Sequence, residues 1–284
     1  MPDFPIIDSH LHIWDLGQLR YPWLAEVPKI NETRTLADFD AARGPVEVEA
    51  MVFLQAEVDR AQFHDEADWV AEVAARDGRI RAMVPWAPLE KGREVEADLE
   101  KLKRHAITRG IRRIIQFEDD LEFCLRPDFI EGVRTLARHD LSFDICIDHR
   151  HMANTIEFVR QCLDVPMVLD HIGKPDIAGG HLHPWAEQMH TLARFENVWL
   201  KMSGVATEAD HAGWTRDELR PFIETALEAF GAGRTMFGGD WPVATLAIDY
   251  PDWVAVLDEV LAGASQDEKR AIWRDTARSF YRLG

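Results

Sequence analysis

Short apolar runs alternate with helical patterns along almost the whole chain, and this alternation restricts the possible folds more than any other feature. The apolar runs lie at residues 6–14, 48–56, 80–86, 111–117, 142–148, 165–171, 198–203 and 235–239. Helical patterns follow at residues 64–76, 94–105, 127–139, 152–163, 185–195, 218–230 and 250–261, with a closing helix at 266–281. Such an alternation is typical of parallel strands in βα units. Eight units of this kind close into a TIM barrel.

The alternatives to a single barrel fit the sequence less well. A length of 284 residues allows two domains, but α/β barrels of roughly 250 residues form one domain. An open doubly wound sheet more often has five or six strands, and no glycine-rich phosphate loop follows the first strand here. The chain contains no short repeat, low-complexity tract or linker. We therefore expect one α/β domain, a (β/α)8 barrel spanning residues 1–284.

The charge and the cysteines restrict the partners and the compartment. A net charge of −18 argues against binding to nucleic acid or to an anionic membrane surface. The three cysteines are widely spaced, and neither a secretory signal nor a long apolar run accompanies them. These features are typical of reduced thiols in a cytoplasmic protein. The remaining expectation is a small-molecule partner, with a homo-oligomer left open.

Two histidines near the start of the chain are the first candidates for chemistry. His10 and His12 lie within the apolar run at 6–14, and residues i and i+2 of a strand point to the same face. Two imidazoles on one buried face are costly unless they bind a metal, form hydrogen bonds or take part in catalysis. The alternative interpretation is a pair of polar residues at a strand end, satisfied by their neighbours.

The other candidates follow from the barrel itself, because its active site lies at the carboxyl ends of the strands. His171 ends the sixth apolar run, and Asp240 follows the eighth run after two glycines, where backbone can approach a ligand closely. The remaining strand-end residues are Gln55, Glu57, Trp86, Gln116, Glu118, Asp148, His149, Asp170, Lys201, Ser203 and Trp241.

Several short motifs resemble one enzyme family over nearly the whole chain. They are Ile-Asp-Ser-His-Leu-His at 7–12, Arg-Tyr-Pro-Trp-Leu at 20–24, Gly-Ile-Arg-Arg at 110–113, Asp-His-Ile-Gly-Lys-Pro at 170–175 and Gly-Asp-Trp-Pro at 239–242. In these motifs the sequence resembles the sugar-lactonase branch of the amidohydrolase superfamily. That branch includes L-fuconolactonase-like and L-rhamnonolactonase-like hydrolases and is related to 2-pyrone-4,6-dicarboxylate hydrolase.

The resemblance implies a hydrolase that opens a sugar lactone to the aldonic acid. Asp240 would be the general base on water, and His171 and Arg112 would stabilise the developing charge. His10, His12 and Asp240 would hold one divalent metal, a zinc-like ion, unless the chain works without a metal as the related pyrone-dicarboxylate hydrolase is thought to do.

Two departures from the binuclear members of the superfamily argue against a second metal. The fourth strand carries no lysine to act as a bridging ligand and has Gln116 and Glu118 instead. The metal-ligand position on the fifth strand, which is usually a histidine in the superfamily, falls near Asp148 or His149 in this sequence.

For substrate binding we expect aromatic side chains along one face of a polyhydroxylated ring and polar side chains at its hydroxyl groups. These residues are Trp23, Gln55, Glu57, Trp86, Gln116, Lys174 and Trp241.

Other functions stay open on the sequence alone. A hydrolase of a carboxylated pyrone or muconolactone ring would need converging arginines, and only Arg112, Arg113 and Arg150 lie near strand ends. A decarboxylase would be expected to keep a clear histidine ligand on the fifth strand. A barrel that only binds a ligand would be expected to carry an incomplete set of strand-end residues.

Overall fold

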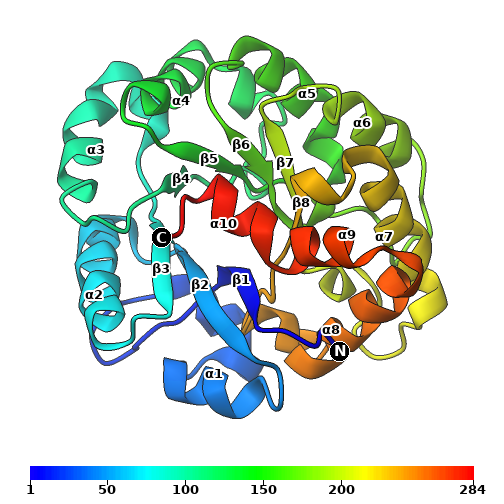
Figure 1. Cartoon of the computed structure of the whole chain (residues 1–284). Coiled ribbons are helices and arrows are strands. Elements are labelled where there is room, and N and C mark those ends of the chain that lie inside the picture. Colours follow the sequence, from blue (N-terminus) through cyan, green and yellow to red (C-terminus); the bar gives the residue numbers. More distant parts are fainter.

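Eight parallel strands form the centre of the protein in a computed structural model that describes all 284 residues (Figure 1). The strands are β1 (Ile6–Leu11), β2 (Val48–Leu54), β3 (Ile80–Val84), β4 (Gly110–Arg112), β5 (Ser142–Ile145), β6 (Met167–Leu169), β7 (Val198–Met202) and β8 (Thr235–Phe237). Hydrogen-bonded pairs run in chain order from β1 to β3 and from β4 to β8.

Short bridges close the two remaining seams of the barrel. Met83 pairs with Thr108 between β3 and β4, and Leu11 pairs with Trp241 between β1 and the end of β8. At the second seam, the backbone N–H of Asp240 donates to the carbonyl of His10 at 2.8 Å. The first and last strands therefore lie side by side, as the predicted TIM barrel requires.

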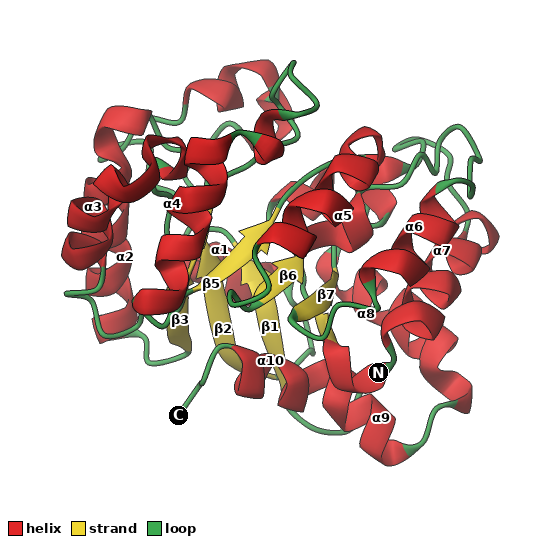
Figure 2. Ribbon diagram, turned by 90° about the horizontal axis from the view of Figure 1, so that it is seen from above, coloured by secondary structure: helices red, strands yellow, loops and turns green.

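The helices form an outer layer around the strands (Figure 2). They are α1 (Leu36–Ala42), α2 (Phe63–Arg76), α3 (Glu96–Leu102), α4 (Pro127–Arg138), α5 (Met152–Gln161), α6 (Trp185–Leu192), α7 (Arg216–Phe230), α8 (Tyr250–Val260), α9 (Gln266–Arg270) and α10 (Thr276–Phe280). Thr35, Thr215 and Ser265 begin α1, α7 and α9 with capping boxes that satisfy free backbone N–H groups. None of the helices combines the length and the apolar character needed to cross a membrane.

Helix α10 covers one end of the barrel, where Figure 1 shows it crossing in front of the strands. Its Ala277 and Phe280, with Tyr281 just after it, pack against side chains of the barrel interior such as Val52 and Val168. A second, larger apolar layer fills the space between the strands and the surrounding helices. The active-site end of the barrel is therefore the opposite one, at the carboxyl ends of the strands.

Most elements begin and end within a few residues of the predicted ranges, and the differences that matter most for the fold are in two strands and one helix. β4 and β5 end at Arg112 and Ile145, short of the predicted 117 and 148. Beyond β4 the chain turns, because the N–H groups of Ile115 and Gln116 both donate to the carbonyl of Cys146. The predicted helix at 266–281 is divided by a π-helical turn over Ala271–Asp275.

Candidate active site

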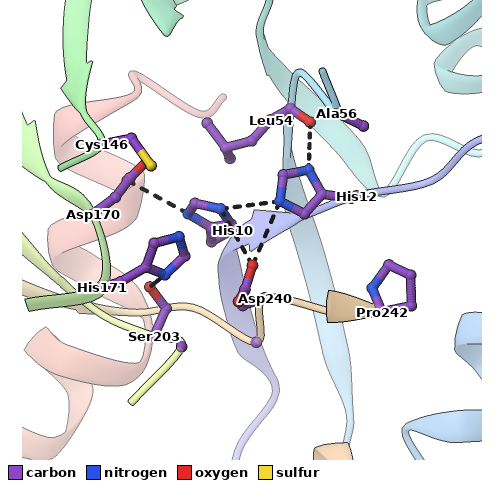
Figure 3. Close-up of polar contacts among 12 residues, drawn as sticks. His10, His12, Leu54, Ala56, Cys146, Asp170, His171, Ser203, Asp240 and Pro242 are labelled. Carbon is purple, nitrogen blue, oxygen red and sulfur yellow. Dashed lines mark hydrogen bonds and ion pairs between the residues drawn. The ribbon is translucent and has the colours of Figure 1, made fainter. Parts of the chain in front are cut away.

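Side chains from β1 and from the loop after β8 meet at the carboxyl end of the barrel (Figure 3). The Nε2 atoms of His10 and His12 are 3.2 Å apart, which confirms that the two imidazoles share a face. Oδ1 of Asp240 lies 3.6 Å from Nε2 of His10 and 3.5 Å from Nε2 of His12. All three side chains are almost completely buried.

Two glycines allow Asp240 to approach β1 this closely. A Cβ atom on Gly238 would lie 2.7 Å from Cβ of His10, and one on Gly239 would lie 2.2 Å from the ring of Tyr250. Asp240 itself adopts a left-handed conformation with φ of 51°, which a non-glycine residue seldom adopts outside functional or tight-turn positions. The backbone is thus bent so that the carboxylate faces the histidines.

Asp8 fixes this bend to β1, a role that the sequence did not reveal. Its carboxylate accepts hydrogen bonds from the backbone N–H of His10 at 2.9 Å, the backbone N–H of Gly239 at 2.8 Å and the hydroxyl of Tyr250 at 3.0 Å. Burial raises the pKa of Asp8 to about 6 although these three donors oppose the shift. Asp8 therefore holds β1 and the loop that carries Asp240 together.

His171 joins the cluster from the end of β6. Its ring centroid is 4.4 Å from that of His10, and its Nδ1 lies 3.0 Å from the hydroxyl oxygen of Ser203. Gly204 makes room for this ring, since a Cβ atom there would lie 2.6 Å from Nδ1 of His171. Burial, followed by the field of His10, lowers the pKa of His171 well below its ordinary value, so the ring is neutral.

Two basic side chains flank His10. Arg112 places Nη1 3.1 Å from Nε2 of His10, and Lys201 places Nζ 3.4 Å from Nδ1. Asp170 connects the two cations, with contacts of 3.3 Å to Arg112 and 3.1 Å to Lys201. Burial, then Lys201 and Arg112, lowers the pKa of His10 well below its ordinary value.

Lys201 continues this network into the barrel interior. Its ammonium lies 2.5 Å from Oδ2 of Asp144 on β5, and the hydroxyl of Tyr281 donates to the same oxygen at 2.6 Å. All three side chains are completely buried, so each charge needs the other because an unpaired buried ion is strongly destabilising. In the sequence this pair is signalled only by a lysine within an apolar run.

The donor atoms of His10, His12 and Asp240 fit a tetrahedral metal site. Ligands at about 2.0–2.1 Å from a zinc ion in tetrahedral geometry are about 3.3 Å apart, close to the 3.2, 3.5 and 3.6 Å measured here. Nδ1 of His12 lies 2.8 Å from the carbonyl of Leu54, the second hydrogen bond that metal-binding histidines usually make. These residues can therefore hold one divalent cation.

A pocket opens above this cluster and offers about 110 Å³ into which water-sized molecules fit. The predicted site residues that line it are His12, Trp23, Glu57, Arg112, Gln116, His171, Lys174 and Asp240. Ala56, Ile114, Phe117, Cys146 and Val243 complete the lining and were not predicted. Direct contact of any of them with a substrate stays a prediction.

Hydrogen bonds from two different segments fix the backbone of Ala56, which lines the pocket. The indole of Trp23 donates to the carbonyl of Ala56 at 2.8 Å, and the carboxyl group of Glu66 on α2 accepts from the N–H of Ala56 at 3.2 Å. Glu66 is completely buried. Burial raises its pKa to about 8, although the hydrogen bond from Ala56 opposes the shift.

Three predicted substrate residues lie outside the pocket. Trp86 packs on Phe63 with ring centroids 4.9 Å apart, and Trp241 packs on Phe39 at 5.5 Å. Gln55 is completely buried, and its amide donates to Glu57 at 2.7 Å. These three side chains are buried and do not line the pocket.

Neither Asp148 nor His149, the two residues near which the fifth-strand ligand position was expected, belongs to the cluster of His10, His12 and Asp240. Asp148 caps a 3₁₀ turn by accepting from the N–H of Arg150 at 2.9 Å, and His149 is exposed. Because β5 ends at Ile145, these residues lie in the following loop. His181 and His183 also lie outside the site, where both are exposed and paired with Asp176 and Glu187.

Comparison with known proteins agrees with this architecture. The family model described as amidohydrolase matches residues 7–283. An L-fucono-1,5-lactonase of Burkholderia multivorans is 34% identical, covering 98% of this chain and 96% of the relative. The L-fucono-1,5-lactonase of Burkholderia ambifaria is 30% identical, covering 98% of this chain and 95% of the relative.

Among solved structures, an amidohydrolase of Burkholderia multivorans with bound zinc is similar with a TM-score of 0.89 and 30% identity. The similarity covers 99% of this chain and 100% of that chain. With a family match over nearly all residues and relatives aligned from end to end, the chain belongs to the amidohydrolase family.

Proposed function

We propose that this protein is a hydrolase that opens a sugar lactone to the corresponding aldonic acid, with Asp240 as the general base. The observation that carries the proposal is the buried carboxylate of Asp240, which faces two imidazoles at the base of a small pocket. The relatives named L-fucono-1,5-lactonase support the substrate class.

Asp240 is suited to accept a proton from water at neutral pH. Burial alone would raise its pKa, but the adjacent ring of His171, a hydrogen bond with His12 and the charge of Lys174 lower the pKa below its ordinary value. The group is therefore ionised. In the proposed reaction it takes a proton from a water as the oxygen attacks the lactone carbonyl, and it returns the proton to the ring oxygen as that bond breaks.

Three side chains of the pocket can stabilise the negative charge that develops on the lactone carbonyl oxygen during the attack. Arg112 and Lys174 are cationic, and neutral His171 can donate from Nε2 when the hydroxyl of Ser203 donates to its Nδ1. Burial alone would lower the pKa of Lys174, but the carboxylate of Glu208 at 3.7 Å raises it, so the ammonium stays charged. Groups fixed in this way stabilise an oxyanion without reorganising.

A divalent cation on His10, His12 and Asp240 would polarise the carbonyl and lower the pKa of a bound water when present. The general base Asp240 and the cationic side chains Arg112 and Lys174 are present whether or not a metal is bound.

The pocket walls fit a neutral polyhydroxylated ring. Trp23 supplies an aromatic side chain, and Glu57 and Gln116 supply acceptors and donors for hydroxyl groups. A dicarboxylated ring is less well accommodated because the other two strand-end arginines do not reach the pocket. Arg113 pairs with Glu90 and Glu118, and the exposed Arg150 pairs with Asp148.

The test uses a panel of aldono-1,4- and aldono-1,5-lactones at slightly alkaline pH, with acid release as the readout. We expect Asp240→Asn to lower kcat by at least about 100-fold, because the amide cannot accept the proton. Asp249→Asn, the same change at an exposed position in the same segment, serves as the matched control and should keep full activity. Near wild-type hydrolysis by Asp240→Asn would exclude this base.

The same assay with and without a chelator measures how far a metal contributes. Loss of acid release with the chelator, restored by added zinc, would assign the polarising role to the metal. Unchanged acid release would assign that role to Arg112, Lys174 and His171.

A further inference from the structure

The position of Arg112 beside the candidate metal ligands has a consequence for metal binding. We propose that the guanidinium of Arg112 and a divalent cation are alternative occupants of the same lone pair on His10. Arg112 would then set how tightly the site binds metal. The inference rests on the geometry of the pocket floor and does not depend on the lactone assignment.

The hydrogen-bond partners fix the position of the proton on His12, whereas Nδ1 of His10 faces both a donor and an acceptor. A backbone carbonyl only accepts, so Nδ1 of His12, 2.8 Å from the carbonyl of Leu54, carries the proton and its Nε2 is bare. Nδ1 of His10 faces two groups, Nζ of Lys201 at 3.4 Å and Oδ1 of Asp170 at 3.5 Å, and the same Oδ1 lies 3.1 Å from Lys201. With its proton on Nδ1, facing Asp170, the ring of His10 has a bare Nε2, and this is the form in which Nε2 can bind a metal.

Nε2 of His10 is also the atom that Arg112 contacts at 3.1 Å. A guanidinium only donates hydrogen bonds and is always charged, so this contact uses the single lone pair of the imidazole nitrogen. A metal at about 2.0–2.1 Å needs the same lone pair. Two positive groups cannot share it, and each therefore excludes the other.

Other contacts hold Arg112 in this position. Its Nη2 donates to the carbonyl of Gln55 at 2.5 Å, and its Nη1 lies 3.3 Å from Asp170. Its Nε, in contrast, is buried and has no acceptor, so the guanidinium is not fully satisfied where it lies. Because Arg112 also lines the pocket, a metal that takes the lone pair can displace the side chain toward the pocket space.

The test measures zinc affinity by competition with a chromophoric chelator, without any substrate. We expect Arg112→Gln to bind zinc at least about tenfold more tightly than the wild type, because a neutral amide no longer repels the ion. Arg150→Gln makes the same change in net charge at an exposed position and should leave zinc affinity unchanged. Unchanged or weaker zinc binding by Arg112→Gln would overturn the proposal.

A second measurement needs no variant and applies even if Arg112→Gln fails to fold. In a crystal structure of the wild type soaked with zinc, an ion on His10 should be accompanied by movement of Arg112 beyond hydrogen-bond distance of Nε2. Zinc coordinated by His10 with Arg112 still at hydrogen-bond distance from that nitrogen would refute mutual exclusion. Loss of lactone hydrolysis in an activity assay would leave both results unaffected, so the two proposals fail separately.

Discussion

Replacing Glu66 by glutamine should change how the stability of the protein depends on pH. Glu66 is completely buried below the pocket wall, and its pKa of about 8 exceeds the ordinary value of 4.5. Between these two values the folded chain keeps a proton that the unfolded chain releases, so the unfolded state binds fewer protons. The free energy of unfolding must then fall as pH rises through this window.

The size of the effect follows from the two pKa values. Each pH unit in the window corresponds to about 1.4 kcal/mol, so the wild type should lose roughly 3 to 4 kcal/mol between pH 5 and pH 8 through this group alone. Glutamine has the same shape and does not titrate, so Glu66→Gln should not show this loss. Its carbonyl oxygen can still accept from the N–H of Ala56.

The assay is denaturant unfolding of both proteins at pH 5 and pH 8. The stability of Glu66→Gln relative to the wild type should rise by the amount above on going to pH 8. Glu72→Gln, at an exposed position of the same helix, corrects for general effects of the substitution and should follow the wild type. A difference between Glu66→Gln and the wild type that is the same at both pH values would refute the argument.

Three further predictions test the pocket. Gly204→Ala should destabilise the fold by about 1 kcal/mol or more and reduce kcat, because φ is 58° there and the new methyl group would lie 2.6 Å from Nδ1 of His171. Denaturation and lactone kinetics check both effects. Lys174→Met should lower kcat/KM about 10- to 100-fold through loss of the ammonium charge, whereas Glu208→Gln, which keeps that charge, should have a smaller effect. Trp86→Phe should leave KM unchanged, because this side chain lies outside the pocket; a clear rise in KM would place it against the substrate.

The sequence predicted the barrel and part of its site because both depend on local periodicity. The i, i+2 spacing of His10 and His12 fixes a shared face on any strand, and the structure confirms it with an Nε2–Nε2 distance of 3.2 Å. The rule that strand ends carry the site then selected His171 and Asp240, which lie in the same cluster. None of these inferences required knowledge of the spacing between strands.

The errors occurred where tertiary contacts end a strand early. Asp148 and His149 follow a continuous apolar run, and nothing in that run shows that the ladder stops at Ile145. Local sequence patterns also could not predict side-chain hydrogen bonds between residues far apart in the chain. The contact of Asp8 with Gly239 joins residues 231 positions apart, and the pairing of Lys201 with Asp144 depends on the stagger of β5 and β7 around the barrel.

The position of the site across the seam between β1 and β8 has a consequence for folding. Contacts between residues so distant in sequence carry a large loop-closure cost and are expected to form late. A refolding chain should therefore regain its helical circular dichroism before its enzymatic activity, with an interval set by closure of this seam. Recovery of enzymatic activity would then report on closure of the barrel, the last step of folding, and not on the initial formation of compact helical structure.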